Sequence, residues 1–262
     1  MEQKQVKSAG RVLDILELLT NAQHGLKLSD ISRELELPVS STHGLIRTLL
    51  RRGYLERNSS HKTFKLGLKV LEIGSVYLQG IDVVEEAKPV MKELVQICNE
   101  TINLAILERT DIIYVAKEEG SQSMRLISYV GKRLPAHATS LGKILLSEYK
   151  EDEIDSLYQD HVLEKLTPKT VCDLNQLKGE LELIRQKGYG YDNEESTEGL
   201  KCMGAPIFNH ENKIVAALSI SIPTVRLDNR KMEETITLVQ DAGRQISRKI
   251  GWSGSITPTA VQ

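Results

Sequence analysis

The stretch PVSSTHGLIRTLLRRGYL, residues 38–55, carries side chains suited to two kinds of chemistry. Ser40 and His43 lie three residues apart, so on a helix they could pair as a nucleophile and its general base. Arg47 and Arg51 lie four apart and could pair with phosphates. A catalytic serine also needs an acid to orient the histidine, and this stretch contains none. The pattern therefore favours nucleic-acid contact, with helix capping and surface polarity as the structural alternative.

The charges of the chain are unevenly distributed. Residues 1–70 have a net charge of +5 and residues 71–262 a net charge of −7. Between Arg47 and Lys69, seven basic residues stand against the single acid Glu56. A basic segment on an otherwise acidic chain favours binding to a polyanion, although a solvated charged surface would show the same charges.

The elements that must position these side chains follow from the hydrophobic period. Apolar residues three and four apart predict helices over residues 8–20, 28–37 and 39–52. The segments YLERN and TFKLG, on either side of a basic turn, predict a two-stranded β-hairpin. Three helices and a hairpin form a winged helix-turn-helix, in which the third helix reads the DNA.

The third predicted helix has an aliphatic and a polar face. At 100° per residue, the apolar pairs at 45–46 and 49–50 share one side, and Gly44 falls on the other. Glycine there costs roughly 1 kcal/mol of helix stability relative to alanine, but it would permit a close backbone approach to DNA. We expect DNA contacts from Ser29, Ser40, Ser41, Thr42, His43, Arg47, Arg51 and Lys62.

The rest of the chain predicts a second domain. Residues 68–83 are too apolar for a free linker and predict a linker helix that packs on its own chain or on a partner subunit. From about residue 103 the period changes to short strands with helices between them. We predict an α+β chain: a DNA-binding domain over 1–67, an α/β domain with an antiparallel sheet and flanking helices over 84–250, and a flexible tail over 251–262.

Two features of the second domain suggest a ligand pocket. In the strand AALSISIP, Ser219 and Ser221 share one face, and small hydroxyl side chains suit the wall of a polar pocket. A solvent-exposed strand face is the alternative. A helix predicted to open at residues 139–142 offers unpaired N–H groups that suit a carboxylate or phosphate, although every helix has such an end.

Cys202 and Asp192 allow a further reading. Cys202 could act as a nucleophile with His137 as its base, but a buried, inert cysteine is commoner. Asp192 could accept hydrogen bonds from ligand hydroxyls. The three cysteines form no CxxC pair and the six histidines show no metal-ligand spacing. We therefore predict neither a metal site nor a cofactor.

The sequence also bears on the compartment. No apolar stretch approaches the ~18 residues that a membrane-spanning helix needs. An odd number of cysteines without a disulfide framework fits a reducing environment. We predict a cytoplasmic protein that does not span a membrane.

Five blocks of the sequence, taken in order, resemble one family: SAGRVLDILELL, LSDISRELELPVSSTHGLIRTLLRRGYLERN, LPAHATSLGKILLS, GYGYDNEESTEGLKCMGAPIF and AALSISIP. Together they resemble the IclR-type bacterial transcriptional regulators over residues 8 to about 250. The resemblance implies a winged helix-turn-helix, a linker helix and a GAF-like effector-binding domain. It implies a homodimer, often a dimer of dimers, on a palindromic DNA operator, and no enzymatic activity.

The resemblance further implies a small organic acid as effector. Matched by motif, the effector-binding positions of the family fall on Ser140, Leu141, Asp192, Cys202, Ser219 and Ser221. Many members have Gly-Ala at the first two positions, which predicts a narrower pocket here. Many also have arginine where this chain has Gly44, which puts a family-derived base preference in doubt.

The sequence therefore predicts a DNA-binding transcriptional regulator, a repressor rather than an activator, whose operator affinity depends on a small organic acid. The alternative is a Cys202-dependent small-molecule hydrolase fused to a DNA-binding domain.

Overall fold

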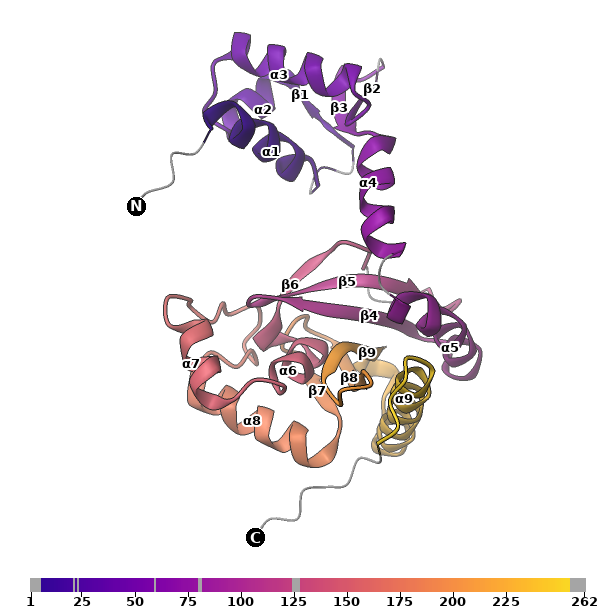
Figure 1. Ribbon diagram of the computed structural model, residues 1–262. Coiled ribbons are helices and arrows are strands. Elements are labelled where there is room, and N and C mark those ends of the chain that lie inside the picture. The colour runs from indigo at the N-terminus through magenta and orange to yellow at the C-terminus, as the bar shows by residue number, and fades with distance from the viewer. Residues whose placement is uncertain are drawn as a thin grey trace. The chain divides into compact units, whose positions relative to one another are not determined.

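Figure 1 shows the computed structural model of the chain, which describes residues 6–20, 22, 24–58, 60–79, 82–123 and 128–254. The chain divides into two compact units, residues 1–80 and residues 81–262. The first is a winged helix-turn-helix and the second an α/β unit with an antiparallel sheet, so the predicted fold class is confirmed.

The first unit packs its helices against a small sheet. Its elements are α1 (Lys7–Thr20), β1 (Leu26–Lys27), α2 (Leu28–Glu34), α3 (Val39–Arg51), β2 (Leu55–Asn58), β3 (Thr63–Leu66) and α4 (Leu68–Gln79). One apolar cluster joins the helices to the sheet, and its buried members are Ile15, Leu19, Ile31, Ile46, Leu49, Leu55 and Phe64. The aliphatic stripes of the helices thus form a single core.

The sheet of this unit has three strands in the order β1-β3-β2, rather than the two that the sequence predicted. Leu26 of β1 pairs with Phe64 of β3. Gly25 permits this approach: its φ is +73°, and a Cβ there would lie 2.5 Å from the Phe64 carbonyl oxygen. A strand of two residues is too short to show a period, so pattern reading missed it.

The second unit has a six-stranded sheet with helices on both faces. Its helices are α5 (Asp82–Cys98), α6 (Ser140–Leu146), α7 (Glu151–Tyr158), α8 (Leu174–Lys187) and α9 (Asn229–Lys249), with short 3₁₀ helices at Ala136–Ala138 and Thr224–Arg226. Its strands are β4 (Thr101–Glu108), β5 (Asp111–Glu118), β6 (Arg133–Pro135), β7 (Gly190–Asn193), β8 (Leu200–Phe208) and β9 (Ile214–Pro223). They lie in the order β6-β5-β4-β9-β8-β7, and every neighbouring pair is antiparallel.

The two faces of this sheet carry different helices, as Figure 1 shows for α6 and α9. Gly204 of β8 faces α6, since a Cβ on it would lie 2.8 Å from the Ile144 side chain. The next residue, Ala205, faces Gly243 of α9. Gly190, paired with Gly204 across β7 and β8, also lies under Ile144. The two glycines therefore let α6 pack directly on the backbone of the sheet.

The ends of the predicted segments differ from the structure. The linker helix predicted over 68–83 corresponds to α4, which ends at Gln79; residues 80 and 81 lie outside the described residues. Trp252, predicted to lie in a flexible tail, is buried, stacks on Phe208 with ring centroids 5.4 Å apart, and donates from Nε1 to Asn212 Oδ1 at 2.7 Å. The folded chain thus continues beyond residue 250, and residues 255–262 lie outside the described residues.

Within the described part of the chain, no helix combines the length and the apolar character that crossing a bilayer requires.

Candidate DNA interface and effector pocket

Helix α3 presents a polar face to solvent and an apolar face to the core. Ile46 and Leu49 are buried, whereas Ser40, His43, Arg47 and Arg51 are exposed. The exposed residues lie within one sector of the helix, because three or four residues make nearly one turn. This is the face that a reading helix turns to the major groove.

Thr42 does not belong to that face. It is fully buried, and its Oγ1 donates to the Pro38 carbonyl oxygen at 3.1 Å. Ile46 and Leu49 follow it by four and seven residues, which places Thr42 on the same buried stripe. The prediction that Thr42 contacts DNA is therefore wrong.

The tip of the β2–β3 hairpin lies beside the start of α2. Asn58 Oδ1 accepts hydrogen bonds from the backbone N–H groups of Ser60, at 3.0 Å, and His61, at 3.3 Å. Lys62 adopts a left-handed φ of +53° and is exposed. One shallow surface groove brings the predicted residues Ser29 and Lys62 together; it is lined by Lys27, Leu28, Ser29, Val39, Ser60, His61 and Lys62. Lys27, a cation two residues before Ser29, was not among the residues predicted from the sequence.

The cations of this unit differ in their partners. Arg33 pairs with Asp30 at 3.2 Å, and Lys65 pairs with Glu56 at 3.2 Å. Among the residues that the structure describes, Arg47 and Arg51 have no acidic partner. The two guanidinium groups of the outer face of α3 thus remain available to phosphates or to the edge of a guanine.

A row of polar side chains crosses four strands of the second unit. The strand register aligns Asp192, Cys202, Ser221 and Thr101. Two residues further along each strand, it aligns Gly190, Gly204, Ser219 and Asn103. Residues directly opposite or two apart share a face of a sheet. Both rows therefore lie on the face that α6 covers.

The start of α6 closes the space above these rows. Thr139 caps the helix, because its Oγ1 accepts from the Gly142 N–H at 2.9 Å. The six predicted effector-binding residues, Ser140, Leu141, Asp192, Cys202, Ser219 and Ser221, all line one cavity. Its remaining walls are Tyr114, Lys132, Leu134, Thr139, Ser196 and Thr197, which the sequence reading did not select. This cavity is the candidate effector site and is referred to below as the effector pocket. It measures about 20 Å³, room for about one water molecule.

Asp192 is buried in the wall of the effector pocket and is held by the loop that follows it. Its Oδ1 accepts from the N–H groups of Glu195 at 2.7 Å and Ser196 at 3.4 Å, and its Oδ2 accepts from Ser196 Oγ at 2.6 Å. Burial raises the pKa of Asp192 to about 6, and the hydrogen bonds from Ser196 and Glu195 limit that rise. The balance of these effects leaves the pKa of Asp192 above the usual range of an aspartate.

Cys202 lacks the surroundings of a catalytic thiolate. Its Sγ donates to Ser221 Oγ at 3.3 Å. Burial, together with the nearby Asp192, holds the pKa of the Cys202 thiol well above its usual range. His137, the base considered for it, has Nε2 2.9 Å from the Glu164 carbonyl oxygen, and burial lowers the pKa of His137. A reactive cysteine needs an electropositive, partly exposed setting, so this geometry disfavours the hydrolase alternative.

Two buried polar atoms of β4, the strand that pairs with Ser219 and Ser221, have no hydrogen-bond partner among the described residues: Thr101 Oγ1 and Asn103 Nδ2. Asn103 Oδ1 accepts from Ser128 Oγ at 2.9 Å, which fixes the amide. Unsatisfied buried polar atoms are rare in native proteins, and each calls for an explanation such as a water, an ion or a functional role. Neither residue was predicted from the sequence, although the threonine and the asparagine stand at alternate positions of the apolar strand TINLAILE and so share one of its faces.

Within the described residues, no cluster of three or more His, Cys, Asp or Glu side chains is placed to hold a metal ion.

A winged helix-turn-helix with a cationic reading helix, joined to an α/β unit with a polar cavity, defines a DNA-binding transcriptional regulator. The chain belongs to the IclR family of such regulators. The family model of the IclR helix-turn-helix domain matches residues 8–59, and that of the bacterial transcriptional regulator IclR C-terminal domain matches residues 75–248.

Individual relatives are similar along nearly their whole length. The HTH-type transcriptional regulator XynR of Escherichia coli K12 is 34% identical over 247 residues, 94% of this chain and 98% of XynR. The HTH-type transcriptional repressor AllR of the same strain is 33% identical over 249 residues, 95% of this chain and 92% of AllR. The crystal structure of the Thermotoga maritima IclR is 29% identical with a TM-score of 0.77, covering 95% of this chain and all of that one.

Proposed function

We propose that the protein is a cytoplasmic repressor that binds a palindromic operator as a homodimer or dimer of dimers, and that a small hydroxy- or keto-acid in the effector pocket changes its DNA affinity. The name of the relative AllR supports repression. The observation that carries the effector part is the buried polar row of Asp192, Cys202, Ser221 and Thr101 beneath the capped start of α6.

The chemistry of the pocket favours an acid that also carries oxygen functions. Lys132 supplies a positive charge at the wall, and Asn103, which pairs with the wall residue Ser219, carries in Nδ2 a buried donor without a partner among the described residues. Both suit a carboxylate. Ser219 and Ser221 can donate to, or accept from, a hydroxyl or keto group. The loss of hydrogen bonds to buried partners would discriminate strongly against an analogue without these oxygens.

The small size of the pocket suggests how effector binding changes the conformation of the protein. Room for about one water molecule is too little for an organic acid, so the walls must move apart when the effector enters. An effector that binds only an opened conformation shifts the population toward it. Because binding linkage is reciprocal, operator DNA must then change effector affinity by the same factor as the effector changes DNA affinity.

The first unit supports the dimeric state. Leu68, Leu71 and Ile73 of α4 are each more than half exposed. Apolar side chains grouped on one helix commonly mark a protein–protein contact. Two-fold symmetry would set two α3 helices on half-sites one DNA turn, or a multiple of it, apart.

The test is calorimetry on the full chain with a panel of sugar-derived hydroxy- and keto-acids, followed by DNA-binding titrations with and without each acid that binds. We expect binding that weakens at least tenfold in Asn103→Leu, and equal reciprocal coupling to operator DNA. Acid binding that persists undiminished in Asn103→Leu and in Ser219→Ala would place the site elsewhere, and tight binding without any change in DNA affinity would overturn the regulatory role.

A further inference from the structure

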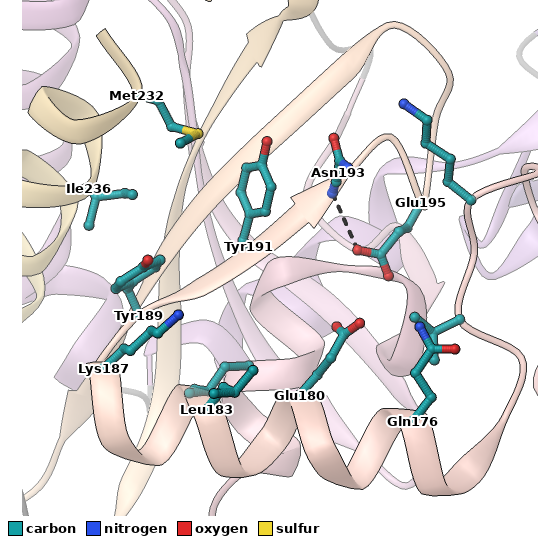
Figure 2. Close-up of a pocket in the computed structure, with 13 residues that line it drawn as sticks. Gln176, Glu180, Leu183, Lys187, Tyr189, Tyr191, Asn193, Glu195, Met232 and Ile236 are labelled. Carbon is teal, nitrogen blue, oxygen red and sulfur yellow. Dashed lines mark hydrogen bonds between the residues drawn. The ribbon is translucent and has the colours of Figure 1, made fainter. Parts of the chain in front are cut away.

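A second and larger cavity lies in the second unit (Figure 2) and shares no lining residue with the effector pocket. It is a groove of about 640 Å³ between α8, the edge strand β7 and the first half of α9. Its apolar walls are Leu183, Ile184, Met232 and Ile236, with the rings of Tyr189 and Tyr191 beside them. This volume lies within the 300–1,000 Å³ of small-molecule sites.

One end of the groove is acidic and incompletely paired. Glu195 is 5% exposed; its Oε1 accepts from Lys143 Nζ at 2.7 Å and from the Asn193 N–H at 3.3 Å. Its Oε2 has no hydrogen-bond partner among the described residues. Glu180 accepts from the same Lys143 Nζ at 2.7 Å, and Figure 2 shows the carboxylates of Glu180 and Glu195 pointing toward one another. Two carboxylates thus share one ammonium group.

This arrangement leaves the acidic end of the groove with one carboxylate oxygen that has no donor and with a net negative charge. A buried carboxylate oxygen without a donor is unfavourable, and two carboxylates against one ammonium leave a net negative charge. Burial pulls the pKa of Lys143 down, but Glu195 and Glu180 outweigh that effect and keep it raised, so the ammonium stays charged. The nearby Lys169 is bound to Glu194 and does not supply the missing donor. A charge-assisted N–H from outside the chain would satisfy the oxygen.

We propose that this groove is a second ligand site, separate from the effector pocket, for a primary amine with an aromatic or branched apolar body. The ammonium group of the ligand donates to Glu195 Oε2, and its apolar body covers Leu183, Met232 and Ile236. A carboxylic acid of the same shape is repelled by the two carboxylates. The site therefore takes the opposite charge from the one that suits the effector pocket.

The site is linked to the effector pocket by two short connections. The backbone N–H of Glu195 donates to Asp192 Oδ1 at 2.7 Å, and Asp192 lines the effector pocket. Lys143 belongs to α6, whose first residues, Ser140 and Leu141, also line that pocket. An amine bound to Glu195 therefore affects both its hydrogen bond to Asp192 and its ion pair with Lys143, and through them the position of the walls of the effector pocket.

The test uses phenethylamine as the probe and full-length protein in calorimetry at neutral pH. We expect one molecule to bind per chain with a Kd below about 1 mM, which a ligand of this size can reach. Phenylacetate, the matched acid, is expected to bind at least tenfold more weakly. Glu195→Gln and Leu183→Trp are each expected to weaken phenethylamine binding at least tenfold, whereas Gln186→Trp, on the exposed side of α8, leaves it unchanged.

Leu183→Trp carries the test if Glu195→Gln fails to fold, because Leu183 is 48% exposed and its replacement fills the groove without touching the ion pairs. No heat of binding at 5 mM probe (a concentration well above the expected Kd), or binding that survives Leu183→Trp, overturns the site. A changed oligomer mass in sedimentation for Leu183→Trp but not for Gln186→Trp also overturns it, by showing that a second copy of the chain occupies the groove.

Discussion

The outer face of α3 and the effector pocket are both polar surfaces on an aliphatic base, yet they are built in opposite ways. The α3 face belongs to one helix, and its arginines are exposed and have no acidic partner among the described residues. The effector pocket draws its walls from five strands and the start of α6, and most of its lining residues are buried. The first site is ready for a charged partner, whereas the second is closed.

This difference determines what a substitution does. An exposed side chain without internal partners can be removed at little cost to folding, so its loss appears in binding alone. A buried polar side chain belongs to the hydrogen-bond network of the core, so its loss or ionisation changes stability as well. The four predictions below test that contrast, from the largest expected effect to the smallest.

The pH dependence of Asp192 should give the largest effect. Burial raises the pKa of Asp192 to about 6 in the folded chain, whereas an unfolded aspartate titrates near ~3.9. Between these values the folded state holds the proton and the unfolded state has released it, so this contribution to stability falls as the pH rises from about 4 to about 6. The loss amounts to about 3 kcal/mol, because the window spans about 2 pH units and each pH unit contributes about 1.4 kcal/mol.

Asp192→Asn removes that titration. The unfolding free energy of the wild type minus that of Asp192→Asn should therefore fall by about 3 kcal/mol between pH 4 and pH 7. Urea unfolding can be followed by the fluorescence of Trp252, the single tryptophan, which lies in the second unit together with Asp192. Asp160→Asn, at an exposed position, is the matched control. A difference that stays constant across this pH range would show that Asp192 is not desolvated as the structure indicates.

Arg47→Ala should give the next largest effect, and only on DNA binding. Loss of a paired arginine contact costs about 1–3 kcal/mol, or roughly a 10- to 100-fold weaker operator affinity. Fluorescence anisotropy with labelled operator measures it, and the unfolding midpoint should stay unchanged. Arg33→Ala, which removes an exposed arginine already paired with Asp30, serves as control. Unchanged operator affinity in Arg47→Ala would remove this residue from the interface.

These two sites also show where sequence reading succeeds. The polar face of α3 was predictable because the 3.6-residue period of a helix puts Arg47 on the side opposite the buried residues. The same period puts Thr42 on the buried side and would have excluded it from the DNA contacts. In the effector pocket, alternation along one strand identified Ser219 and Ser221. The family resemblance placed Asp192 and Cys202 with them, but no pattern within one strand does so, because their alignment with Ser221 comes from pairing between strands.

Non-local pairing explains what was missed. Asn103 lies beside Ser219 because β4 pairs with β9, more than 100 residues later in the chain. The groove around Glu195 has walls from α8, β7 and α9, and no local pattern marks any of them as a site. Sequence periods thus predict the elements and their buried faces, but the set of side chains that meet across elements requires the register and packing of the fold.

The double variant Ser219→Ala, Ser221→Ala should have a smaller effect, confined to the effector. Each lost neutral hydrogen bond costs about 0.5–1.5 kcal/mol, so acid binding should weaken about tenfold. Operator affinity without effector should stay within twofold of the wild type. Calorimetry and anisotropy on the same preparation separate the two. If operator affinity falls as far as effector affinity, the serines support the fold rather than the ligand.

Gly44→Ala should give the smallest effect and addresses the contact between α3 and DNA most directly. A Cβ on Gly44 would meet no atom within 4 Å, so the substitution is sterically free in the folded chain. Alanine should stabilise the helix by about 1 kcal/mol. Gly179→Ala in α8, where a Cβ also meets nothing, is the matched control and should bring a similar gain in its own unit without affecting DNA. If the backbone of α3 approaches the bases at position 44, Gly44→Ala lowers operator affinity several-fold although it stabilises the protein. If both alanine variants bind operator as tightly as the wild type, the backbone at Gly44 does not contact the DNA. The bases are then contacted by neighbouring side chains of α3 such as His43 and Arg47.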